Sequence, residues 1–114
     1  MQNVGIVLPK KDYKFLLEES EMANCQYAKD LCKEAEKQAV ACPNEKYIYL
    51  YFEDVEWDKA KLEIRIIEDV LAELLDYEII KVDKESGNVV EIYDGEEHVK
   101  MLSVVDGKIV FATK

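Results

Sequence analysis

The chain has 114 residues, of which 49% are hydrophobic and 35% charged, and its formal net charge is −10 at pH 7. This length fits a single domain over residues 1–114, and two prolines and four glycines are too few for disorder throughout. The excess of carboxylates disfavours direct binding of nucleic acid or an anionic membrane, because like charges repel.

The chain begins with a short apolar run, Val4 to Leu8, which is too short for a signal peptide. No stretch approaches the ~20 apolar residues of a membrane span, so we expect a cytoplasmic protein. The run predicts a buried strand, and Pro9 ends it because proline lacks an N–H and suits the first turn of a helix.

From about residue 11 to residue 41 the apolar residues recur at helical spacing, which predicts a long N-terminal helix. Cys42-Pro43-Asn44 would stop it, because the residue before a proline disfavours helical geometry. The apolar face of this helix comprises Tyr13, Leu16, Leu17, Ala23, Tyr27, Ala28, Leu31, Ala35, Ala39 and Cys42.

A helix of this length would overhang a small domain, which suggests self-association through it or docking onto a partner. Small alanines and a central asparagine are typical of places where a second helix packs closely, although a partly exposed helix has the same pattern. The candidate oligomerisation residues, for a possible homodimer, are Leu17, Asn24, Ala28, Leu31 and Ala35.

Residues 46–52 alternate strictly and predict a strand. Ile48, Leu50 and Phe52 would face the core, which puts Tyr47, Tyr49 and Tyr51 in a row on the other face. That row is either an exposed aromatic surface or a second core layer covered by a helix.

Asp58 to Asp76 predicts a second amphipathic helix with Asp58 as its N-cap. The remainder predicts four strands, at 78–82, 89–93, 99–105 and 109–113, with Asp106-Gly107 as the clearest hairpin turn. The expected fold is α+β: a long N-terminal helix and a second helix packed with an antiparallel sheet of four to five strands, ending in a C-terminal β-meander. The segment Val4 to Leu8 is a candidate additional strand.

The negative charge is concentrated in the middle of the chain, where residues 53–97 carry 16 carboxylates and 5 bases. Unpaired carboxylates are rarely buried, so this segment should form an acidic surface, which attracts basic partners or serves solubility alone. The candidate partner-binding residues are Tyr47, Tyr49, Tyr51, Glu53, Asp54, Glu56, Trp57 and Asp58.

Common catalytic and metal motifs are absent from the sequence. His98 is the only histidine and has no nucleophile motif beside it, so we expect a surface strand residue and no catalytic residues. Cys25, Cys32 and Cys42 lack the close spacing of a zinc site, and we expect reduced thiols, with no metal and no cofactor.

These features predict a non-enzymatic binding protein, an acidic inhibitor that occupies a basic site of a nucleic-acid-handling protein. Small acidic inhibitors of host defence carried by phages, including anti-CRISPR proteins and other nucleic-acid mimics, offer an analogy of type, without any shared residue motif. The alternative is a homo-oligomeric structural or accessory subunit that associates through the long N-terminal helix.

Overall fold

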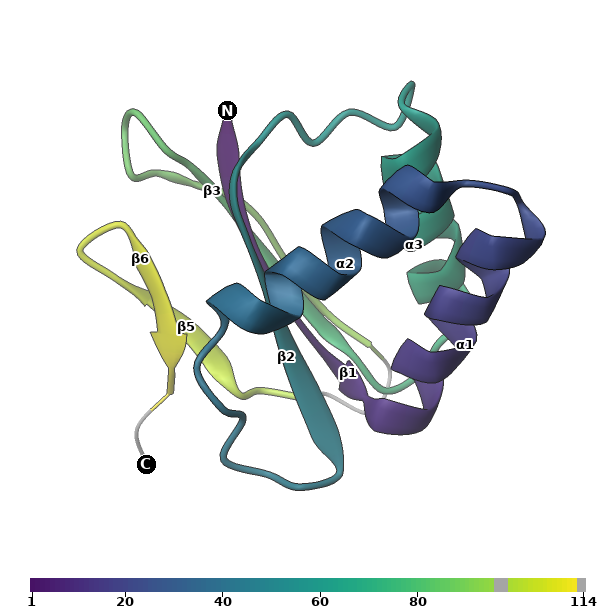
Figure 1. Ribbon diagram of the computed structural model, residues 1–114. Helices are drawn as coiled ribbons and strands as arrows, with labels where there is room; N and C mark the ends of the chain where they lie inside the picture. Colours follow the sequence, from purple (N-terminus) through teal and green to yellow (C-terminus); the bar gives the residue numbers. More distant parts are fainter. Residues whose placement is uncertain (96–98, 113–114) are drawn as a thin grey trace.

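Figure 1 shows the computed structural model, which describes residues 1–95 and 99–112. Within these residues the chain has an α+β fold with three helices, a four-stranded antiparallel sheet and a two-stranded hairpin. The elements are β1 (Gln2–Pro9), α1 (Lys10–Met22), α2 (Gln26–Gln38), β2 (Tyr47–Val55), α3 (Leu62–Ala72), β3 (Glu78–Asp83), β4 (Val89–Asp94), β5 (Leu102–Val105) and β6 (Lys108–Phe111). No helix in this described part is long and apolar enough to cross a membrane.

The sheet has the strand order β2-β1-β3-β4, and each neighbouring pair is antiparallel. The predicted strand Val4 to Leu8 is confirmed as part of β1, which lies between β2 and β3. Ile6 is opposite Leu50 on one side and Ile79 on the other. Because both faces of β1 are covered, its residues form a continuous apolar run instead of an alternating one.

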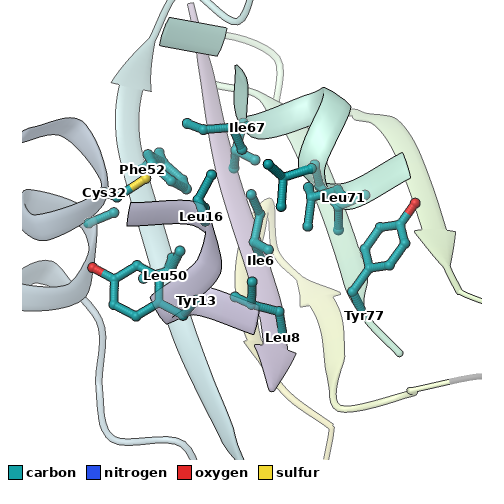
Figure 2. Close-up of a cluster of buried hydrophobic side chains, with 14 residues drawn as sticks. Ile6, Leu8, Tyr13, Leu16, Cys32, Leu50, Phe52, Ile67, Leu71 and Tyr77 are labelled. Atoms are coloured by element: carbon teal, nitrogen blue, oxygen red, sulfur yellow. The ribbon is translucent and has the colours of Figure 1, made fainter. Parts of the chain in front are cut away.

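The helices cover one face of the sheet, as the right half of Figure 1 shows. Leu50 and Phe52 of β2 are fully buried there, together with Leu16 of α1 and Ile67 of α3 (Figure 2). The prediction that the aliphatic side of residues 46–52 meets the core is therefore confirmed. Each such side chain contributes roughly 1.5–3 kcal/mol through removal of apolar surface from water.

The hairpin formed by β5 and β6 covers the opposite face of the sheet (Figure 1). Its turn is the predicted Asp106-Gly107, and both residues have positive φ, 52° and 75°, as in the two-residue turns that match strand twist. Gly5 of β1 lets the hairpin approach, since a Cβ there would lie 3.0 Å from Cγ2 of Ile109. The predicted continuous meander is wrong, because β5 and β6 form a separate sheet.

The predicted long N-terminal helix is also wrong: it is divided into α1 and α2. Asn24 adopts a left-handed conformation with φ of 54°. Its N–H donates to the carbonyl of Glu21, and the Cys25 N–H donates to that of Ser20. This is the Schellman arrangement, in which asparagine can replace the usual glycine. The break turns the chain, so residues before and after it no longer share one helical face.

The second helix is shorter than predicted, because α3 begins at Leu62 and ends at Ala72. Asp58 closes a turn instead of capping the helix: its Oδ1 accepts the Ala60 N–H at 2.9 Å, and its carbonyl accepts the Lys61 N–H. His98, predicted as a surface strand residue, lies outside the described residues.

Candidate binding surface

The end of β2 turns the predicted carboxylates outward. A register irregularity opposite Asn3 gives Asp54 a left-handed backbone with φ of 56°, and its N–H donates to Oδ1 of Asn3 at 2.8 Å. All four predicted carboxylates, Glu53, Asp54, Glu56 and Asp58, are exposed here, whereas Val55 and Trp57 between them are half-buried.

Two of these carboxylates are paired with lysines. Asp54 lies 3.3 Å from Nζ of Lys84, and Glu56 lies 2.9 Å from Nζ of Lys61. All four side chains are between 42% and 59% exposed. Exposed pairs of this kind contribute about 0–1 kcal/mol, so a cation from a partner could replace either lysine at little cost.

The same turn forms one wall of a shallow hollow whose other wall is α2. Its volume is about 280 Å³. We call it the acidic hollow, and it is lined by Met1, Tyr27, Leu31, Asp54, Val55, Glu56, Lys61, Glu63 and Ile64. Tyr27 is 78% exposed, so the hollow combines three carboxylates with an accessible aromatic ring.

A second hollow, of about 260 Å³, lies between α1 and α3. Glu19, Asp69 and Glu73 line it beside Phe15 and Ile66, without a basic residue in its wall. Among the residues that the structure describes, these carboxylates have no ion-pair partner. The helical side of the molecule therefore carries unneutralised negative charge next to apolar surface.

The predicted row of tyrosines does not join the acidic hollow. Tyr49 is only 6% exposed and packs edge-on against Phe111 of β6, with ring centroids 5.0 Å apart. The row is therefore covered, but by the β5–β6 hairpin and not by the helix that we considered. Burial raises the pKa of the Tyr49 hydroxyl above its usual range. Tyr47 and Tyr51 are half-buried, and the Tyr47 hydroxyl donates to Oδ1 of Asp76 at 2.7 Å.

Trp57 attaches the acidic turn to α3. Its ring lies edge-on to Phe52 at 5.2 Å, and its Nε1–H donates to Oε1 of Glu68 at 2.7 Å. Glu68 also pairs with the buried Lys81 of β3, which bonds to Glu91 of β4 at 2.9 Å. Burial opposes the charge on Lys81, but these hydrogen bonds outweigh it, and the pKa of Lys81 lies above its ordinary value. The Trp57 side chain thus makes its contacts within the protein, with Phe52 and Glu68.

The candidate oligomerisation residues are dispersed by the break after α1. Ala28 and Ala35 are buried in the core, while Leu17 and Leu31 are half-buried against it. Asn24 is exposed at the break. Leu31 lines the acidic hollow, so the structure unites it with Asp54 and Glu56 instead of with the other helix candidates.

Sequence reasoning did not single out Tyr27 and Glu63 as surface binding residues. The uninterrupted helix placed Tyr27 on the buried face, whereas the left-handed Asn24 changes the helical phase and exposes it. The available signal was Asn24 itself, since asparagine tolerates the left-handed conformation better than most residues.

Comparison with known proteins gives no match to a protein-family model, a curated protein or a solved structure. Within residues 1–95 and 99–112, no group of three or more histidine, cysteine or carboxylate side chains could hold a metal ion. Cys32 is buried, and burial raises the pKa of its thiol to about 12. A thiol held protonated in this way is a poor nucleophile.

Proposed function

We propose that this chain is a non-enzymatic binding protein whose acidic surface occupies a basic site of a nucleic-acid-handling protein. The observation that carries the proposal is the acidic hollow, which Asp54, Glu56 and Glu63 line together with the exposed aromatic ring of Tyr27. Sites that bind phosphate backbones are rich in arginine and lysine, and carboxylates attract the same cations.

The residues of the hollow suit an arginine in particular. Its guanidinium can donate two parallel hydrogen bonds to one carboxylate and stack on an aromatic face. An exposed ring such as that of Tyr27 adds roughly 0.5–1 kcal/mol by this cation–π contact. Lys61 and Lys84 hold Glu56 and Asp54 only through exposed ion pairs, which a competing arginine can exchange.

Charge also gives the proposed binding a measurable signature. The chain carries a net charge of −10, so association with a basic site should be fast at low salt and weaken as salt rises. Nucleic acid should compete, because it uses the same basic site on the partner.

The test uses three forms of the protein as bait in a nuclease-treated bacterial lysate, eluted along a salt gradient and analysed by mass spectrometry. One bait is unaltered, and one carries Asp54→Lys, Glu56→Lys and Glu63→Lys. The matched control carries the same charge change at exposed carboxylates outside the hollow, Glu18→Lys, Glu34→Lys and Glu45→Lys.

We expect the unaltered protein and the control to retain a nucleic-acid-binding protein that added DNA or RNA displaces. The hollow variant should lose it while keeping its circular dichroism spectrum and melting temperature. Equal loss in both variants would mean that total charge, not the hollow, determines binding. Capture that is indifferent to salt and to nucleic acid would refute the proposal.

A further inference from the structure

β4 is an outer strand whose free side has backbone groups ready to pair. The Gly95 N–H donates to the Tyr77 carbonyl at 2.7 Å, which makes residues 77 and 95 a hydrogen-bonded pair. Such pairs alternate along an antiparallel ladder, so Tyr93 and Glu91 also direct their N–H and C=O toward β3. The backbone groups of Ile92 therefore point away from the sheet.

The other side of β3 supports this assignment independently. The Lys84 N–H donates to the Met1 carbonyl at 3.1 Å, so the alternate residues Val82 and Ile80 pair with β1. That leaves Ile79 and Lys81 to hydrogen-bond with β4, in agreement with the assignment from the pair of Tyr77 and Gly95. Within the described residues, the N–H and C=O of Ile92 have no hydrogen-bond partner.

Apart from Glu91 and Asp94, the side chains of β4 are apolar or aromatic, and they are exposed on both faces. The exposed fractions are 44% for Val89, 54% for Val90, 60% for Ile92 and 48% for Tyr93. Outer strands are commonly protected from pairing by lysine, proline or a bulge. β4 contains neither lysine nor proline, and its one register irregularity with β3 lies at the Val89 end, whereas the pairs around Ile92 are regular. Its carboxylate Glu91 pairs at 2.9 Å with Lys81, a lysine that it shares with Glu68.

We propose that β4 pairs antiparallel with β4 of a second copy, about a twofold axis at Ile92, to form a sheet continuous across a dimer. A second copy fits because the strand supplies both halves of an isologous contact: free backbone groups at Ile92, exposed apolar side chains and a carboxylate already paired with a lysine. A basic strand from another protein gains less here, because Glu91 already has its cation.

The register follows from the side chains. With the two Ile92 residues opposite each other, Glu91 faces Tyr93 of the second copy, an acceptor opposite a hydroxyl donor. A shift in one direction would place the two Glu91 residues directly opposite at about 4.5 Å between Cα atoms. A shift in the other direction would place Ile92 opposite Asp94. The register centred on Ile92 avoids both.

The net charge of −10 on each copy opposes this association and gives it a distinctive salt dependence. The electrostatic screening length is about 8 Å at physiological ionic strength. Carboxylates of the two copies that lie farther apart than this therefore repel each other only weakly. The dimer should therefore become tighter as salt rises, whereas the proposed basic partner should bind more weakly. The proposed dimer does not depend on the proposed function, so an experiment can refute either proposal without refuting the other.

Sedimentation velocity over a range of concentrations and salt provides the test. We expect the unaltered protein to shift from monomer toward dimer with concentration, and at lower concentration in high salt. Ile92→Lys should raise the dimer dissociation constant at least about tenfold, because two lysines would lie directly opposite each other. The control Val110→Lys alters a 38% exposed strand valine on β6 and should dimerise normally.

A cysteine scan checks the register. Two Ile92→Cys chains would have Cα atoms about 5.5 Å apart, inside the range of about 4.4–6.8 Å that disulfides require. In this register two Glu91→Cys residues lie on opposite sides of the axis and should not crosslink. Crosslinking of the unaltered protein, whose Cys25 and Cys32 are buried, gives the background.

Unaltered protein that remains a monomer at every concentration and salt would overturn the proposal, as would a dimer that Ile92→Lys leaves intact. Crosslinking through Glu91→Cys instead of Ile92→Cys would refute the axis at Ile92. Circular dichroism of each variant verifies folding, which an exposed position should preserve.

Discussion

The two outer strands of the sheet, β2 and β4, are both rich in β-branched and aromatic residues, yet their surroundings are opposite. β2 lies between helices and hairpin, with Tyr49, Leu50 and Phe52 buried. The residues that the structure describes cover β4 far less: Tyr93 packs against Tyr77, but Ile92 is 60% exposed. Local sequence therefore made both into strands, whereas the packing of other elements decided which one is protected. An outer strand left apolar and uncovered is where association is to be expected.

The largest effect should come from the protected strand. Leu50→Ala removes a fully buried side chain, and we expect a loss of about 2–5 kcal/mol in the free energy of unfolding. The matched change in β4, Ile92→Ala, should alter it by less than about 0.5 kcal/mol. Urea unfolding at a concentration where the protein is monomeric measures both. Similar losses would mean that the two strands are equally covered.

An intermediate effect should come from loosening the hairpin of β5 and β6, which covers the face of the sheet opposite the helices. Oε1 of the buried Glu78 accepts the N–H groups of Met101 at 2.8 Å and Leu102 at 2.9 Å. Glu78→Ala leaves these donors unsatisfied, at a cost of about 1–3 kcal/mol. Amide hydrogen exchange should show lower protection in β5 and β6 than in β1. Unchanged protection of the hairpin would contradict this role.

The smallest effect concerns pH at the same residue. Burial raises the pKa of the Glu78 carboxyl, so the folded chain holds this proton more tightly than the unfolded chain. Its contribution to stability is therefore full below the unfolded pKa and declines as pH rises through the folded pKa. Glu78→Gln keeps an oxygen acceptor without the charge, and we expect slightly higher stability at neutral pH.

In acid the advantage of Glu78→Gln should disappear, because the carboxyl of the unaltered protein is then neutral as well. Melting temperatures of both proteins between pH 4 and pH 8 give the comparison, with pH 4 near the ordinary pKa of glutamate, about 4.3. A glutamine variant less stable at neutral pH would show that the ionised form is the better acceptor for Met101 and Leu102.

The sequence predicted the features that depend on local patterns. Alternation identified β2 and its buried aliphatic side, and Asp106-Gly107 located the hairpin turn because both residues tolerate positive φ. The α+β class followed from these strands and from the strong apolar stripe of α3. Such signals are local, since each residue's burial repeats with the period of its own strand or helix.

Features that depend on distant contacts were missed. The covering of the tyrosine row by Phe111 joins segments far apart in the chain, and no pattern in residues 46–52 indicates it. The break at Asn24 is local, but it depends on a backbone conformation that asparagine adopts only in some contexts. Because that break sets the phase of α2, the acidic hollow around Tyr27 was not predicted, although two of its three carboxylates, Asp54 and Glu56, were among the predicted binding residues.

The central position of β1 has a consequence for how the chain is made. β1 precedes both of its neighbours in the chain, and it can pair with β2 only when the residues opposite it, such as Tyr47 for Pro9, have been synthesised. Its other neighbour, β3, arrives later still. Until then the apolar run of the first strand stays unpaired, and closing these long loops delays its folding more than it weakens the finished protein. β1 is therefore made before both strands that flank it, yet its pairing is complete only after both have been made.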